Sequence, residues 1–232
     1  MKFGVVIFPG SNCDRDLIET LSTLTEHPVQ ELWHKDTDLK GVDFVFLPGG
    51  FSYGDYLRSG AIAKLSPIMQ SVIEHANKGG YVMGICNGFQ ILCESGLLPG
   101  ALLRNNHQQF ACKNVWLKPG NTNLLTTHLL DANKAYKIPI AHGEGRYYAD
   151  EATLKTIEAN GQVMFRYCNE QGEVTDDSNP NGSLNNIAGI CNAGKNVFGM
   201  MPHPERCFAE HLLNTDGQLV FKSIVQPIAE MA

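Results

Sequence analysis

The stretch Tyr81-Val82-Met83-Gly84-Ile85-Cys86-Asn87-Gly88-Phe89 decides the fold, because an apolar strand runs through a glycine-rich turn into a helix. We predict the strand over 81–85 and a helix that begins at Asn87. In a G-x-C-x-G turn the cysteine is presented at the tip, at the N-terminus of a helix, where the helix dipole favours a thiolate. The pattern predicts that Cys86 is a nucleophile, and the alternative is a buried cysteine in a tight turn.

Outward from this turn, the first half of the chain alternates short apolar strands with amphipathic helices, and the second half is richer in strands. This order predicts an α/β fold with a single domain over 1–232. Its central sheet is expected to be mostly parallel, above all in its first half, with helices on both faces. We predict strands at 2–8, 29–34, 43–47, 115–117, 137–141, 162–167, 187–192 and 197–201, and helices at 14–24, 66–77, 152–159 and 218–228.

A glycine-rich turn follows the predicted strand 43–47 and consists of Pro48, Gly49, Gly50 and Phe51. Backbone N–H groups of such a turn are not screened by side chains. Together with the N–H of Asn87 they are candidates to bind a developing oxyanion, and one such donor typically lowers a barrier by ~2.7–4 kcal/mol. The alternative is an ordinary turn between a strand and a helix.

The segment Pro202-His203-Pro204-Glu205 follows another apolar strand. In extended backbone, residues two apart point to the same side, and we expect the prolines to keep this segment out of a helix. Glu205 can then orient the imidazole of His203, which takes up a proton on its other nitrogen. With Cys86 these residues form a candidate triad of nucleophile, base and orienting carboxylate. A surface His–Glu pair is the alternative.

Composition narrows the class of protein. The net charge is −6, and the Lys and Arg residues are scattered, so nucleic acid is not an expected partner. No stretch approaches the ~18 apolar residues that a membrane span needs, so no membrane is expected either. The seven cysteines include no CxxC pair, which argues against a disulfide framework and a zinc site and favours a reducing cytoplasm. We expect six of them to be buried apolar filler. No metal site is predicted.

The motifs GICNGFQ (84–90) and MPHPE (201–205) resemble those of class I glutamine amidotransferases. Further stretches narrow the resemblance to the glutaminase subunits of phosphoribosylformylglycinamidine synthases. These stretches lie at 10–14, 47–58, 142–146 and 179–190, so the resemblance covers nearly the whole chain.

The resemblance implies a flavodoxin-like sheet and the hydrolysis of glutamine through a Cys86 thioester, with His203 and Glu205 completing the triad. It implies oxyanion or substrate contacts from Gly49, Gly50, Phe51, Asn87 and Gln90, and contacts to substrate or partner from Arg58, His142, Gly143 and Glu144. The ammonia would pass to a large synthetase subunit, with a small accessory subunit as a further possible partner.

No Walker A pattern is present, so no cofactor is expected in this chain; ATP and magnesium are expected on the synthetase, and little glutaminase activity is expected without it. Three alternatives stay open at this point. They are a DJ-1-like cysteine hydrolase, an inactive amidotransferase that only docks to a synthetase, and a class I amidotransferase that serves another synthetase.

Overall fold

The computed structural model describes residues 1–25 and 28–226. The first half of the chain alternates strands and helices as the sequence predicts. Its strands are almost continuously apolar, and β1, β3 and β4 are buried on both faces of the sheet. The elements are β1 (Phe3–Ile7), α1 (Asp14–Leu24), β2 (Val29–Trp33), β3 (Phe44–Leu47), α2 (Pro67–Asn77), β4 (Tyr81–Ile85) and α3 (Asn87–Glu94).

The second half adds most of its strands to the same sheet. They are β6 (Ala111–Pro119), β7 (Tyr136–His142), β9 (Val163–Cys168), β10 (Ile187–Cys191) and β11 (Val197–Met200). The sheet order is β2-β1-β3-β4-β11-β10-β9-β6-β7. The strands β2, β1, β3, β4 and β11 are mutually parallel, and each pairing from β11 to β7 is antiparallel. The sheet is therefore mixed, with the parallel half carrying the strand–turn–helix at Cys86.

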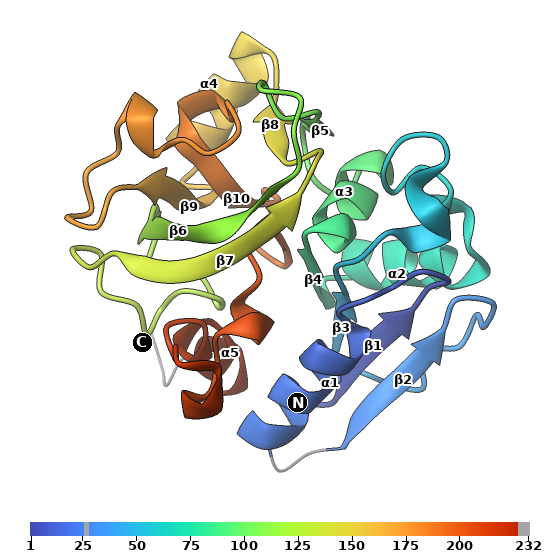
Figure 1. Cartoon of the computed structure of the whole chain (residues 1–232). Coiled ribbons are helices and arrows are strands. Elements are labelled where there is room, and N and C mark those ends of the chain that lie inside the picture. Colours follow the sequence, from blue (N-terminus) through green and yellow to red (C-terminus); the bar gives the residue numbers. More distant parts are fainter. Residues whose placement is uncertain (26–27, 227–232) are drawn as a thin grey trace.

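Helices cover both faces of the parallel half (Figure 1). Helix α1 packs against β1 and against α5 (Gln218–Val225), whereas α3 packs against β3, β4 and β11. Aromatic rings pack between the sheet and α5, where the ring centroids of Phe46 in β3 and Phe221 in α5 lie 6.4 Å apart. Helix α4 (Glu151–Ala159) lies beside the antiparallel half (Figure 1). The predicted α/β fold class, with a sheet that is parallel in its first half, is confirmed.

The differences from the predicted elements concern short strands and the C-terminal end. Two strands were not predicted, β5 (Ala101–Leu103) and β8 (Arg146–Tyr148), and they pair only with each other. The strand predicted at 115–117 is longer and spans all of β6. Helix α5 ends at Val225, and residues 227–232, which include the end of the predicted helix and of the predicted domain, lie outside the described residues.

Across residues 1–25 and 28–226, none of the helices combines the length and the apolar character that crossing a bilayer requires.

Candidate active site

Cys86 occupies the turn between β4 and α3, as the sequence predicts. Its backbone has φ 50° and ψ −104°, an unusual conformation for a residue with a side chain. The flanking glycines make this turn possible. A Cβ on Gly84 would collide with the backbone of Gly88, and a Cβ on Gly88 would collide with the carbonyl of Leu47. The sharp turn aims the cysteine away from the helix that follows it.

The Cys86 side chain is only 5% exposed, so it does not stand free on the surface as the motif suggested. It lines a cavity of about 250 Å³ together with the loop after β3 and the loop after β7. Its Sγ lies 3.8 Å from the carbonyl oxygen of Ala141 in β7. A substrate therefore reaches the sulfur through this cavity, which we call the thiol cavity.

His203 is brought to Cys86 by the sheet. Strand β11 runs parallel to β4, with Met200 beside Ile85, so both chains leave the sheet at the same edge. The N–H of His203 donates to Pro139 of β7 over 2.8 Å, which fixes the backbone at this point. Residues more than a hundred positions apart in the sequence thus share one corner of the fold.

The carboxylate of Glu205 holds the imidazole of His203. The Nδ1 of His203 lies 2.6 Å from Oε1 of Glu205, and the two side chains are 2% and 1% exposed. The extended backbone predicted here is wrong, because Pro204 begins a short 3₁₀ turn, Pro204–Arg206. Proline fits a first helical turn, since its missing N–H would lack a partner there. The predicted pairing of the two side chains nevertheless forms.

The pKa of His203 lies well above its ordinary value. Burial alone would lower it, but the carboxylate of Glu205 and the sulfur of Cys86 favour the protonated ring more strongly. Gly49 makes room for this meeting. A side chain on Gly49 would begin 2.7 Å from Cε1 of His203, 3.4 Å from Cβ of Cys86 and 3.1 Å from Sγ of Cys13. The imidazole, the predicted nucleophile and a second thiol therefore surround a single glycine.

Cys13 is buried, as the sequence analysis expected of the cysteines other than Cys86, but it also contacts the predicted triad. The expectation of burial is wrong for Cys112, which is exposed. The sulfur of Cys13 accepts a hydrogen bond from Nη2 of Arg206 over 3.1 Å and lies beside His203. Burial raises the pKa of the Cys13 thiol despite the opposing effect of His203. Its nearness to the triad depends on a contact between residues 190 positions apart, for which the local sequence carries no signal.

The backbone donors predicted for an oxyanion differ in their availability. The N–H of Phe51 already donates to the carbonyl of Gly10 over 2.9 Å, so Phe51 contributes its side chain to the thiol cavity rather than its N–H. The N–H of Asn87 lies in the first turn of α3, where helices have no internal acceptor. Gly50 lines the cavity beside Cys86. The N–H groups of Gly50 and Asn87 are therefore the candidates at the cavity wall. Gly49 does not line the cavity, and its missing side chain leaves the space in which His203 and Cys86 meet.

The side chains of Asn87 and Gln90 connect three loops around the thiol cavity. Oδ1 of Asn87 accepts from the N–H of Ser52 over 3.1 Å, and its Nδ2 donates to Oε1 of Gln90 over 2.9 Å. Nε2 of Gln90 donates in turn to the carbonyl of Glu144 over 2.7 Å. Gln90 lines the cavity as predicted, but its amide is occupied in holding the wall.

The other predicted contact residues divide into two groups. His142, Gly143 and Glu144 line the thiol cavity. Arg58 does not line it, because its guanidinium binds Glu94 on α3 with bonds of 2.5 and 2.6 Å. Burial lowers the pKa of His142 to about 4, helped by the neighbouring charge of His203, so this ring is neutral at neutral pH.

Several cavity residues were missed by the sequence analysis. The pKa of Asp55 is raised because its carboxyl group is half-buried and lies near Glu144, although bonds to Ser59 and Asn87 oppose this. Asp55 belongs to the loop between Phe51 and Arg58, so its closeness to the glycine-rich turn was an available signal. No local pattern points to Arg104, which follows the short strand β5. The missed lining residues are Asp55, Ser59, Arg104, Phe110 and Ala141.

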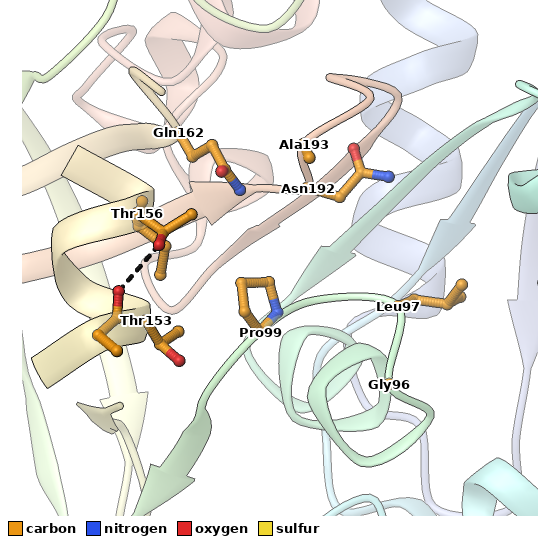
Figure 2. A pocket seen from close by; sticks show the side chains of 10 residues that line it. Gly96, Leu97, Pro99, Thr153, Thr156, Gln162, Asn192 and Ala193 are labelled. Atoms are coloured by element: carbon orange, nitrogen blue, oxygen red, sulfur yellow. Dashed lines mark hydrogen bonds between the residues drawn. The ribbon is translucent and has the colours of Figure 1, made fainter. Parts of the chain in front are cut away.

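A second cavity of about 440 Å³ lies beyond the other end of α3 (Figure 2). We call it the distal cavity. Its wall is formed by Leu97 and Pro99, by Thr153 and Thr156 of α4, and by the segment around Asn192. Cys86 precedes the N-terminus of α3, whereas this wall follows its C-terminus at Glu94. None of the predicted site residues lines it.

Comparison with known proteins gives the class to which this fold and site belong. Residues 1–224 match the family model of the CobB/CobQ-like glutamine amidotransferase domain, and the chain therefore belongs to this family of glutamine amidotransferases. The resemblance to class I glutamine amidotransferases is thereby confirmed.

The similar relatives are more specific. The chain is 55% identical to the phosphoribosylformylglycinamidine synthase subunit PurQ of Acaryochloris marina, covering 98% of this chain and 97% of that one. It is 57% identical to the PurQ subunit of a Synechocystis strain, covering 96% and 99%. Among solved structures, it matches a chain of PurLQS from Thermotoga maritima with a TM-score of 0.85 and 42% identity, covering 97% and 98%.

Proposed function

We propose that this chain is the glutaminase subunit of a phosphoribosylformylglycinamidine synthase. One observation carries the proposal. Cys86 faces a cavity that is large enough for an amino acid, and His203 lies at the same corner with its Nδ1 on Glu205. The similarity to PurQ subunits extends over nearly the full length of the chain, and it supports the choice of this amidotransferase among others that share the fold.

The geometry accommodates hydrolysis of the glutamine side-chain amide in two stages. His203 takes up the thiol proton, and the sulfur of Cys86 attacks the amide carbon. The charge on the amide oxygen is stabilised by the N–H groups of Gly50 and Asn87. His203 then gives its proton to the leaving nitrogen, the C–N bond breaks, and ammonia leaves a glutamyl thioester. In the second stage His203 takes a proton from water, the oxygen attacks the thioester, and glutamate leaves with the thiol restored.

Charges around the thiol cavity are arranged to hold the other end of glutamine. Asp55 and Glu144 lie on its wall as two neighbouring carboxylates, and the exposed cation Arg104 lies on the same wall. The α-ammonium group of glutamine would bind the carboxylates, and its α-carboxylate would bind Arg104. Phe51 and Phe110, whose rings stack with centroids 6.3 Å apart, would cover the methylene groups.

The ammonia needs an acceptor on another chain. The relatives are subunits by name, and the matched solved structure is that of an assembly of PurL, PurQ and PurS. We propose that a synthetase subunit receives the ammonia, that a small accessory subunit joins the complex, and that ATP and magnesium bind to the synthetase. The seven free cysteines support a cytoplasmic location for this complex.

The experiment that tests the proposal supplies the assembled enzyme with either glutamine or ammonia. Cys86→Ser is expected to abolish amidation with glutamine and to leave amidation with ammonia intact, because only the first needs the thioester. Cys112→Ser, which changes an exposed cysteine, is the matched control and should support both. Continued use of glutamine by Cys86→Ser would overturn the proposal.

A further inference from the structure

The loop that follows the glycine-rich turn contains three consecutive residues with a positive φ. Tyr53, Gly54 and Asp55 have φ values of 54°, 72° and 51°. Glycine adopts this left-handed conformation freely, whereas in other residues the Cβ atom crowds the following carbonyl oxygen. A run that includes two residues with side chains persists only where the surrounding structure holds it. The contacts of Tyr53 and Asp55 therefore decide the shape of this loop.

The hydroxyl of Tyr53 forms two hydrogen bonds on the side of the loop away from the thiol cavity. It lies 2.7 Å from Nδ1 of His34 and 2.8 Å from Oγ of Ser66. The side chains of His34 and Ser66 are 4% and 5% exposed, so both bonds are shielded from water. A phenol can donate one hydrogen bond and accept another, so it serves both partners whichever tautomer His34 adopts.

Both partners of Tyr53 are fixed to regular elements of the fold. His34 directly follows β2; its N–H donates to the carbonyl of Ile7 in β1 over 3.1 Å, and its carbonyl accepts from the N–H of Ile68 in α2 over 3.2 Å. Ser66 precedes the first residue of α2 and its hydroxyl makes no capping bond, so this hydroxyl is available to Tyr53. One phenol thus ties the loop to both the sheet and a helix.

Asp55, two residues further along the loop, lines the thiol cavity, and Tyr53 does not. Oδ1 of Asp55 lies 3.4 Å from Nδ2 of Asn87, a long hydrogen bond. Asp55 also bonds with Ser59, whose hydroxyl donates to Oε2 of Glu144 over 2.9 Å. The carboxylate therefore has loose contacts on the cavity side, and the backbone that carries it is held from behind by the hydroxyl of Tyr53.

We propose that Tyr53 is a positioning residue for glutamine, because its hydroxyl holds the loop in the left-handed conformation that presents Asp55 to the α-ammonium group. Without this hydroxyl the run relaxes toward negative φ values and the carboxylate leaves the cavity wall. The inference rests on the proposed glutaminase function. The α-ammonium group is remote from the reacting amide, so its contact is equally strong in the ground state and the transition state. Losing it raises KM and leaves kcat unchanged.

Tyr53→Phe is measured in the assembled enzyme with glutamine as the nitrogen source. KM for glutamine should rise by about 3–10-fold, the usual effect of one neutral hydrogen bond, and kcat should stay within about 2-fold. KM for 4-carbamoylbutanoate, which is glutamine without its α-amino group, should barely change, because this substrate has no group for Asp55. An equal rise of KM for both substrates, or a fall in kcat alone, would overturn the proposal.

A double variant shows whether the effect of Tyr53 passes through Asp55. In an Asp55→Asn background, Tyr53→Phe should change KM for glutamine by less than about 2-fold, because the contact that the phenol supports is already lost. The full effect of Tyr53→Phe in that background would show that Tyr53 acts by another route and would contradict the proposal.

Tyr136→Phe is the control for a general loss of stability. The hydroxyl of Tyr136 is also in a buried side chain, and it accepts from the N–H of Asp131 over 2.8 Å. Tyr136 begins β7, whose opposite end at His142 lines the thiol cavity. Both Tyr→Phe variants should lower the midpoint of urea unfolding, but only Tyr53→Phe should raise KM. The same rise of KM in Tyr136→Phe would contradict a positioning role.

Ser66→Ala is a milder variant that carries the same test if Tyr53→Phe does not fold. It removes one of the two bonds, so KM for glutamine should rise by about 2–3-fold, again without a change for 4-carbamoylbutanoate. Amidation with ammonia should be unaffected in every variant. If the wild type uses ammonia but not glutamine, the proposed function fails. If it uses glutamine, but neither Tyr53→Phe nor Ser66→Ala raises KM for it, only the positioning role fails.

Discussion

The two ends of helix α3 show how a cavity with chemistry differs from one without it. The distal cavity, about 440 Å³, is the larger, and the thiol cavity measures about 250 Å³. In the distal cavity the hydroxyl of Thr156 donates to the carbonyl oxygen of Ala152 (Figure 2). The amide of Gln162 donates to the carbonyl oxygen of Cys191, so both polar groups are satisfied. The thiol cavity holds a cysteine with a strained backbone and four further titratable side chains, Asp55, Arg104, His142 and Glu144. Burial raises the pKa of Asp55 and lowers that of His142. Size alone therefore does not locate the function.

The difference between the two cavities is tested most directly by one substitution in each of them, His203→Asn at the thiol cavity and Thr156→Ala at the distal cavity. His203→Asn should lower glutamine hydrolysis by about 10²–10⁴-fold, the usual contribution of a general acid–base. Thr156→Ala, which changes the distal cavity, should leave the rate within about 2-fold, as expected of a change away from the reacting atoms. The measurement is glutamate release by the assembled enzyme. Equal losses in the two variants would contradict the difference drawn between the cavities.

Glu205→Gln tests whether the carboxylate orients and charges His203. The variant should lose about 10²-fold or more in kcat, because the imidazole loses its fixed tautomer. The pKa of His203, followed by NMR of the ring protons, should fall. In the wild type the raised pKa stabilises the fold fully below the unfolded pKa of about 6.5, and this stabilisation is lost as pH rises through the folded value. The stability deficit of Glu205→Gln should therefore be largest at acidic pH.

Whether the charged residues of the thiol cavity bind the α-groups of glutamine is tested by removing a charge from the protein and its expected partner from the substrate. Asp55→Asn should raise KM for glutamine by about 10–100-fold, equivalent to one lost charged hydrogen bond. It should barely change KM for 4-carbamoylbutanoate, which lacks the α-amino group. Arg104→Gln should likewise raise KM for glutamine but barely change KM for 4-aminobutanamide, which lacks the carboxylate that Arg104 would bind. If each variant raises KM for glutamine and for both analogues by the same factor, Asp55 and Arg104 do not bind the α-ammonium and α-carboxylate groups.

The smallest effect concerns the neutral ring of His142. Its pKa is lowered to about 4 by burial, so the unfolded chain binds the proton more readily. Stability from this group is full above a pH of about 6.5 and is lost as pH falls, by about 1.4 kcal/mol at pH 5.5. Urea unfolding of His142→Gln should show a correspondingly weaker loss between pH 7.5 and 5.5. His211→Gln, at an exposed position, is the control and should keep the slope of the wild type.

The sequence determined the parts of this protein that depend on neighbouring residues. The strand–turn–helix at Cys86 follows from glycines that permit a turn no other residue allows. The pairing of His203 with Glu205 follows from their spacing and survives the unexpected 3₁₀ turn. The alternation of strands and helices places α1, α2 and β4 within a residue of their predicted bounds.

The tertiary structure alone decided which distant groups meet. Cys13 reaches His203 because the turn after β1 packs on Gly49, and the N–H of Phe51 is used by Gly10 in the same contact. Strands β5 and β8 have three residues each, too few to show a period, and they form only by pairing with each other across more than forty positions. Local sequence encodes backbone preference, whereas these contacts depend on how the completed sheet brings its loops to one edge.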